Sequence, residues 1–202
     1  MKTSSIVRAY VWFRRVGHCR GFGIQSPWAY NMVRYVINEH FPYYAYKRLK
    51  RRFPADVIRR KTGEFLLRLA NYVQPAIVVA FYLDDDAEKH SEAYLKAGCR
   101  RMEYIRMRKE DGPGILIESI QKDVKPHIVI MDAQCIKDNV LKTISGVLCT
   151  GDYLFIDNLN ARRGIWKNIL KEFQNIVSFD MYYCGLIYLD EKRYKQNYII
   201  NF

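Results

Sequence analysis

The sequence predicts an α/β fold in three layers, with a mostly parallel sheet that closes in a C-terminal antiparallel hairpin. Three short apolar runs support this prediction, at residues 76–81, 127–132 and 152–157. They are rich in β-branched and aromatic residues, which is typical of parallel strands buried on both faces. Two of the runs end in aspartate, at Asp132 and Asp157. Because ligands of open α/β sheets bind outside the carboxyl ends of the strands, we expect a crevice beside these two residues.

The charged residues are unevenly distributed along the 202 residues of the chain. Lysine and arginine number 33 against 21 aspartates and glutamates, which gives a formal net charge of +12. Residues 1–75 contain 15 of the basic and 3 of the acidic residues, whereas residues 76–202 contain 18 of each. We therefore predict a basic helical extension over 1–75 and an α/β domain over 76–202. Such a basic surface favours polyanionic partners, namely nucleic acid, phosphates or anionic lipid.

Helical patterns fill the basic extension. Apolar residues at helical spacing predict an amphipathic helix over residues 5–16, with its arginines largely on the other side. The predicted packed face consists of Ile6, Ala9, Tyr10, Phe13 and Val16. Caps, prolines and glycines bound three further helices. We place these helices at residues 26–41, 43–53 and 62–73.

The second of these three helices contains a candidate site for a polyanion. Within residues 43–61, cations alternate with aromatic side chains, as on surfaces that contact phosphates and stack bases. The cations expected to contact a nucleic acid or another polyanion are Lys47, Arg48, Arg51 and Arg52. The aromatic residues among them are Tyr43, Tyr44, Tyr46 and Phe53. The alternative is a solvated basic face with the rings packed inward.

Beyond Pro75, helices alternate with strand-like runs. Three carboxylates at residues 84–86 suit the start of a helix, and Gly98 suits its end. The remaining helices are predicted at residues 114–122, 137–148 and 163–173. The remaining strands are predicted at residues 101–107, 176–183, 186–189 and 198–202, with a hairpin turn at Cys184-Gly185.

The five cysteines are widely spaced and include no C-x-x-C pair, so the sequence indicates neither a zinc site nor a disulfide framework. No apolar run approaches the roughly 20 residues that span a bilayer. Charged residues also begin too early for a secretory signal. We expect free thiols and a soluble, cytoplasmic protein.

Several motifs follow one another in a recognisable order. They are Gly21-Phe-Gly-Ile-Gln-Ser-Pro-Trp28, the segment from Gly63 to Pro75, Met131-Asp132, Phe155-Ile-Asp-Asn158 and the closing hairpin. Together they resemble class I S-adenosylmethionine-dependent methyltransferases, in particular a small bacterial group with a Gly-Phe-Gly-Ile-His-Ser-Pro-Phe element. Gln25 and Trp28 replace that element's histidine and phenylalanine. The resemblance implies a Rossmann-like fold and S-adenosylmethionine as the cofactor.

The segment after the first strand departs from this family. The family has a glycine-rich turn there, roughly E-x-G-x-x-x-G, whose glycines let the backbone approach the cofactor. Here no glycine lies between Gly63 and Gly98, and the segment is about one βα unit too short. We therefore expect that the loop is lost, that the cofactor lacks a helix N-terminus to rest against, and that the protein is a pseudoenzyme without affinity for S-adenosylmethionine.

Two aspartates occupy positions where the family holds its cofactor. Asp84, or else Asp85 or Asp86, would correspond to the ribose-binding carboxylate, and Asp132 lies at the end of a neighbouring strand. The alternative for Asp84, Asp85 and Asp86 is that they cap a helix, which their position in its first turn favours.

A divalent metal site is the second chemical possibility at these strand ends. Asp132, Asp157 and Asn158 supply the oxygen ligands that Mg²⁺ prefers. They resemble the metal ligands of catechol-type O-methyltransferases, where the ion orients a hydroxyl and lowers its pKa. The alternative is that the aspartates cap helices and that Asp157-Asn158 forms a turn.

Three functions therefore compete. The first is a degenerate methyltransferase-like protein that acts as a binding or scaffold module. The second is an active, metal-assisted O-methyltransferase with a rearranged site, using S-adenosylmethionine and Mg²⁺. The third is an RNA- or phosphate-binding protein that uses the basic N-terminal helices. A fold does not fix a function, so the sequence leaves open whether the chain is an enzyme.

Overall fold

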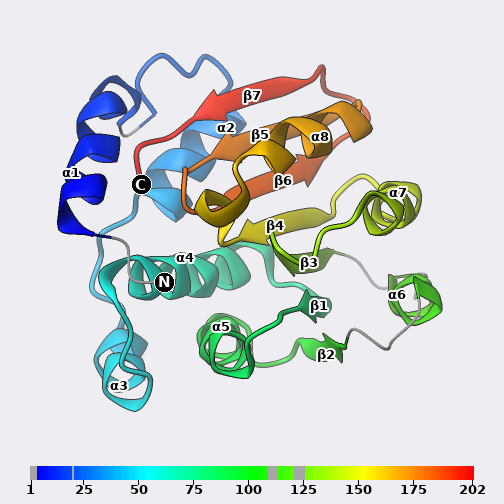
Figure 1. Cartoon of the computed structure of the whole chain (residues 1–202), viewed down its shortest axis with the longest axis horizontal. Helices are drawn as coiled ribbons and strands as arrows, with labels where there is room; N and C mark the ends of the chain where they lie inside the picture. Colours follow the sequence, from blue (N-terminus) through cyan, green and yellow to red (C-terminus); the bar gives the residue numbers. More distant parts are fainter. Residues whose placement is uncertain (1–3, 20, 109–112, 121–125) are drawn as a thin grey trace.

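A seven-stranded sheet runs through the protein, with helices on both of its sides (Figure 1). The computed structural model describes residues 4–19, 21–108, 113–120 and 126–202. The strands are β1 (Ile77–Phe81), β2 (Glu103–Met107), β3 (His127–Asp132), β4 (Tyr153–Asp157), β5 (Ile176–Asp180), β6 (Gly185–Leu189) and β7 (Gln196–Ile199). Their order across the sheet is β2-β1-β3-β4-β6-β5-β7.

Only β6 runs antiparallel to its neighbours in the described part of the chain, and the other paired strands are parallel. The predicted α/β fold, with a mostly parallel sheet and an antiparallel hairpin, is confirmed. The order β2-β1-β3-β4 places the topological switch point between β1 and β3, where doubly wound sheets bind their ligands. The candidate site is therefore sought at the carboxyl ends of these strands.

Two layers of helices cover the sheet. Their members are α1 (Ser5–Arg14), α2 (Pro27–Met32), α3 (Tyr44–Arg52), α4 (Val57–Val73), α5 (Asp85–Gly98), α6 (Pro113–Ile120), α7 (Asp138–Val147) and α8 (Gly164–Glu172), with a π-helix, η2 (Val33–Ile37), and short 3-10 turns η1 (Val16–His18) and η3 (Leu159–Arg162). Alternate strand residues face opposite layers. Val78 and Ala80 share a core with α2, η2, α4 and α5. Ile77 and Val79 share the other core with α6, α7 and α8.

The basic extension belongs to the first of these cores. The ring of Phe65 on α4 lies 5.8 Å from that of Phe155 on β4, centroid to centroid. Buried Arg68 donates hydrogen bonds from Nε to the carbonyl of Val36 (2.6 Å) and from Nη2 to that of Ile37 (2.9 Å). These are carbonyls of the last turn of η2, which its own helix leaves without donors. A buried cation thus joins α4 to η2.

The predicted orientation of α1 is wrong. Ile6 is 81% exposed and Phe13 is 69% exposed, and Ala9, Tyr10 and Val16 also face solvent. Buried Val11 and half-buried Arg15 face the protein instead. Apolar periodicity identifies the residues that share one side of a helix, but hydrogen bonds made by Arg15 decide which side docks.

Two predicted boundaries also differ. Helix α4 begins at Val57 rather than Thr62, because the carboxylate of Asp56 accepts a hydrogen bond from the backbone N–H of Arg59 at 2.8 Å and caps the helix. The last strand covers Gln196–Ile199 rather than 198–202. Within the described ranges, none of the helices combines the length and the apolar character needed to cross a membrane.

Candidate functional site

The connection from β1 to α5 lies at the switch point. It consists of Tyr82, Leu83 and Asp84 and contains no glycine. The helix predicted from residues 84–86 does begin there, at Asp85, so a helix N-terminus follows the first strand although the sequence predicted none for a cofactor to rest against. The carboxylate of Asp84 caps this helix by accepting a hydrogen bond from the N–H of Asp86 at 3.0 Å.

The start of α5 is already occupied by carboxylates. Asp85, Asp86 and Glu88 lie in its first turn, where they complement the helix dipole. Arg106 on β2 forms ion pairs with Asp85 and Glu88. With a capping Asp84 and no glycine to let the backbone approach, these residues do not fit the methionine and ribose parts of S-adenosylmethionine.

Asp132 and Asp157 are neighbours at the carboxyl ends of two adjacent parallel strands, as predicted from the sequence. Their Cα atoms are register partners across β3 and β4. Asp132 accepts hydrogen bonds from the N–H of Gln134 (2.8 Å) and from Nδ2 of Asn158 (3.0 Å). Asp157 accepts hydrogen bonds from the N–H of Asn158 (2.8 Å) and from the hydroxyl of Tyr82 (3.1 Å). Each of the four carboxylate oxygens therefore has a donor.

The environment of this pair shifts the pKa values of Asp157 and of Tyr82, which donates to it. The pKa of Asp157 is raised to about 6, mainly by burial and also by the nearby Asp132, whereas the hydrogen bonds from Asn158 and Tyr82 oppose the shift. Burial, and then the charge of Asp157, raises the pKa of Tyr82 well above its ordinary value. Tyr82 therefore stays a protonated donor, and its hydroxyl also lies 2.9 Å from that of Ser91 on α5.

These residues do not fit a divalent cation. Asn158, with a left-handed backbone (φ 57°), turns its amide nitrogen rather than its oxygen toward Asp132. Among the residues that the structure describes, no group of three or more histidine, cysteine, aspartate or glutamate side chains could hold a metal ion. A cation would have to displace the donors that the two carboxylates already have.

A basic surface lies on α3, away from the sheet edge. The side chains of Lys47, Arg48, Lys50, Arg51 and Arg52 are all exposed. Ala45 and Leu49 hold the helix against Leu67 and Tyr94. The rings of Tyr43, Tyr46 and Phe53 are packed against this cluster, whereas Tyr44 is 76% exposed. Of the four aromatic residues, Tyr44 is thus the one most available for stacking.

A groove of about 560 Å³ separates α3 from α5. Arg48 and Arg52 line it on the side of α3. Lys89, Lys96 and Arg100, which the sequence analysis missed, line it from α5 and the residues after it. Glu92 is the one acidic residue in the lining, and it is paired with Lys96 at 2.5 Å. Lys89 and Lys96 are seven residues apart on one face of a helix, but only tertiary packing places that face beside α3.

Comparison with known proteins gives fold-level likenesses alone. No protein-family model matches the chain, and no curated protein matches it significantly. One similar solved structure is a methyltransferase from Geobacter sulfurreducens, with 20% identity, coverage of 72% of this chain and 88% of that one, and a TM-score of 0.44. Another is a Podospora anserina methyltransferase bound to S-adenosylhomocysteine, with 16% identity, coverage of 76% and 91%, and a TM-score of 0.42. With TM-scores below 0.5, neither likeness assigns the chain to a family.

Proposed function

We propose that the chain is a nucleic-acid-binding module on a methyltransferase-like α/β scaffold, and that it does not use S-adenosylmethionine. Its ligand is single-stranded RNA or DNA, and the binding site is the groove between α3 and α5. The observation that carries the proposal is that five cations from two segments of the chain line this one groove.

The chemistry of the groove supports a phosphate backbone as ligand. Its single acidic residue, Glu92, is already engaged by Lys96, so the lining has a positive excess. Exposed Tyr44, which also lines the groove, can stack on a base. A cationic groove with an exposed ring is the arrangement by which proteins bind single strands without reading their sequence.

Fluorescence polarisation with a labelled single-stranded 12-mer, as RNA and as DNA, tests this site. We expect affinity to fall with salt at a slope of about −0.7 per phosphate contact. The combined change Arg48→Glu, Arg52→Glu and Lys89→Glu should weaken binding at least about tenfold, since it reverses three such contacts. The double variant Lys47→Glu, Arg51→Glu changes two cations outside the groove lining and should weaken binding less than the triple variant.

A matched control separates the groove from net charge. Lys142, Lys167 and Lys171 are exposed on α7 and α8, in the other helical layer. Changing these three to glutamate alters the net charge by the same amount and should leave the affinity within about twofold at 0.15 M salt, where distant charges are screened. Equal losses in both triple variants would reject the groove as the site.

The proposed lack of affinity for S-adenosylmethionine has its own test. At the switch point, Asp84 caps α5 and the carboxylates of Asp132 and Asp157 bond to Asn158 and Tyr82. Isothermal titration calorimetry with S-adenosylmethionine and S-adenosylhomocysteine should show no saturable heat up to millimolar ligand. A saturable isotherm would overturn this part of the proposal and leave the groove untouched.

The alternative function is an active, metal-assisted O-methyltransferase. The observation in its favour is the register of Asp132 and Asp157 on adjacent parallel strands. This function would require a cation to replace the hydrogen-bond donors that these carboxylates now have. The melting temperature in the presence of Mg²⁺ or Mn²⁺ decides between the two functions.

A further inference from the structure

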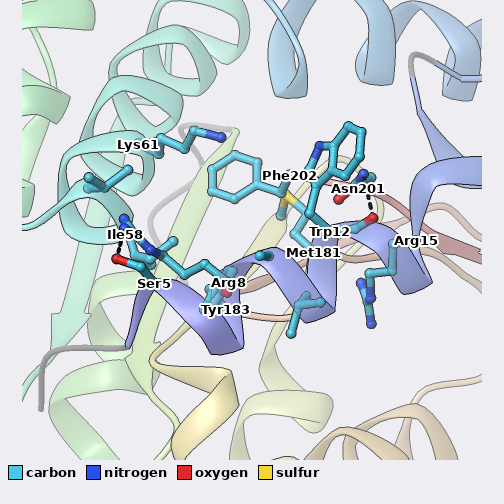
Figure 2. A pocket seen from close by; sticks show the side chains of 13 residues that line it. Ser5, Arg8, Trp12, Arg15, Ile58, Lys61, Met181, Tyr183, Asn201 and Phe202 are labelled. Carbon is cyan, nitrogen blue, oxygen red and sulfur yellow. Dashed lines mark hydrogen bonds between the residues drawn. The ribbon is translucent and has the colours of Figure 1, made fainter.

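A second cavity lies beneath α1, at the carboxyl edge of the sheet. Its volume is about 270 Å³, which is just below the range of roughly 300 to 1,000 Å³ common for pockets that bind drug-sized ligands. Helix α1, the start of α4 and the residues that follow β5 and β7 form its walls (Figure 2). The cavity shares no lining residue with the groove between α3 and α5.

The lining of this cavity is positively charged. Arg8, Arg15 and Lys61 line it, and no aspartate or glutamate does. Arg15 forms an ion pair with Asp180 at 3.1 Å. Neither Arg8 nor Lys61 forms an ion pair within the described part of the chain. Glu64, the carboxylate nearest to Lys61 in sequence, pairs instead with Arg60 at 3.8 Å. Burial lowers the pKa of Lys61, and Arg60, Arg68 and Arg8 lower it further while Glu64 opposes them. An anion in the cavity would relieve this repulsion.

Two hydrogen-bond donors in the lining lack partners. The hydroxyl of Tyr183 is buried without a hydrogen bond, and its side chain belongs to a residue that is only 4% exposed. The Nε–H of Arg8 is also buried without a partner, although Nη2 of the same guanidinium donates to Ser5 Oγ at 3.0 Å. Burial raises the pKa of Tyr183, so the phenol stays protonated and can donate. Buried polar groups of native proteins are nearly always paired, so two unpaired donors on residues that line one cavity support an acceptor that binds there.

Apart from Ser5 and Asn201, the remaining lining residues are apolar. Trp12, Ile58, Met181 and Phe202 line the cavity, and Figure 2 shows the ring of Phe202 between Lys61 and Trp12. The Lys61 ammonium lies 5.8 Å from the centroid of that ring. The site therefore combines a cationic, donor-rich end with aromatic and aliphatic walls. A bare inorganic ion would use only the first of these two features.

We propose that this cavity binds a small organic anion whose head is a carboxylate or a phosphate monoester and whose body is a single ring or short apolar chain. The oxygen atoms of the head accept hydrogen bonds from Arg8 Nε and from the hydroxyl of Tyr183, and Lys61 supplies a third contact and the second positive charge. The body lies between Trp12 and Phe202. This site goes beyond the proposed nucleic-acid-binding function and does not depend on it.

Titration calorimetry of the full chain with four probes tests the proposal. Benzoate and phenyl phosphate have both a charged head and a ring, benzamide has the ring alone, and inorganic phosphate has the charge alone. We expect benzoate or phenyl phosphate to bind at least tenfold more tightly than benzamide and inorganic phosphate. The ratio of the affinities for benzoate and phenyl phosphate distinguishes a carboxylate from a phosphate ligand. The proposal would be overturned if benzamide or inorganic phosphate bound as tightly as the better of benzoate and phenyl phosphate. It would also be overturned if neither benzoate nor phenyl phosphate bound below 10 mM.

Variants locate the site. Arg8→Gln should weaken binding of the better probe at least tenfold, whereas Arg14→Gln, an exposed arginine on the same helix, should leave it unchanged. Tyr183→Phe keeps the ring and removes only the hydroxyl, so it should weaken binding severalfold while leaving the melting temperature of the free protein unchanged or higher. Unaltered binding in both Arg8→Gln and Tyr183→Phe would place the ligand elsewhere and refute the assignment.

Discussion

Arg15, which directly follows α1, and Asp180 at the end of β5 form an ion pair of 3.1 Å across 165 positions of the chain. The same guanidinium donates to the carbonyl oxygens of Asp180 (2.7 Å) and Ile200 (3.1 Å). Arg163 donates to both oxygens of the same carboxylate, at 2.9 Å and 2.6 Å. Burial would raise the pKa of Asp180, but Arg163 and Arg15 outweigh it and hold the pKa below its ordinary value. This interaction, rather than an apolar face, fixes the position of α1.

Arg15→Ala should therefore release α1. We expect a loss of about 2 kcal/mol in the free energy of unfolding, because hydrogen bonds to a buried charged group disappear while Arg163 still pairs with Asp180. Hydrogen exchange of residues 5–14 should accelerate selectively. Arg14→Ala on the exposed side of the same helix is the control and should cost less than about 0.5 kcal/mol. Equal exchange rates in the two variants would show that other contacts hold α1.

Gly98 of α5 lies directly against the backbone of α4. A Cβ at this position would overlap the carbonyl oxygen of Leu67 and press against Ala70. Gly98→Ala should destabilise the protein by about 2 kcal/mol, since a backbone atom cannot move aside as a flexible side chain can. In α7, a Cβ on Gly146 would meet nothing within 4 Å, so Gly146→Ala should stabilise by about 0.5 to 1 kcal/mol through helix propensity. Denaturant unfolding of both variants measures the difference, and a neutral Gly98→Ala would contradict this account of the α4–α5 contact.

The sequence predicted what local patterns encode. The apolar runs placed β1, β3 and β4, and parallel pairing was enough to bring Asp132 and Asp157 together. The orientation of α1 could not be predicted, because it depends on long-range hydrogen bonds that leave no periodic signal. Tyr46 was grouped with the surface aromatics, yet its hydroxyl accepts a hydrogen bond from buried Arg68 at 2.9 Å. A buried arginine satisfied by carbonyls and a phenol has no carboxylate partner to identify it in the sequence.

Neither the groove between α3 and α5 nor the cavity beneath α1 could be predicted from the sequence. Each gathers cations from segments that are distant along the chain, such as Arg48 with Lys89, or Arg8 with Lys61. The charge count over residues 1–75 indicated where cations are abundant. Only the packing of helices determines which of them share one hollow.

Millimolar Mg²⁺ or Mn²⁺ should leave the melting temperature unchanged. All four oxygens of Asp132 and Asp157 already accept hydrogen bonds, and Asn158 presents its amide nitrogen. A ligand that binds the folded state would raise the melting temperature by mass action. A rise that disappears in Asp157→Asn would contradict this prediction and favour the metal-assisted methyltransferase.

The final prediction concerns His90, a buried residue of α5 whose ring faces Phe53, just after α3. It is only 4% exposed, its Nε2 has no hydrogen-bond partner, and its ring lies 6.2 Å from that of Phe53. The pKa of His90 is lowered to about 4, mainly by burial and also by Arg59, while Asp56 opposes the shift.

Because the pKa of His90 is lower in the folded state, the unfolded chain takes up a proton between about pH 6.5 and pH 4 while the folded protein does not. The contribution of His90 to stability is therefore complete above pH 6.5 and is lost as the pH falls, by about 3 kcal/mol at pH 4. In His90→Gln, the difference in unfolding free energy between pH 7.5 and pH 4.5 should shrink by about 2 to 3 kcal/mol. His40→Gln, at an exposed histidine, is the matched control. If both variants keep the full pH dependence of the parent, groups other than His90 destabilise the protein in acid.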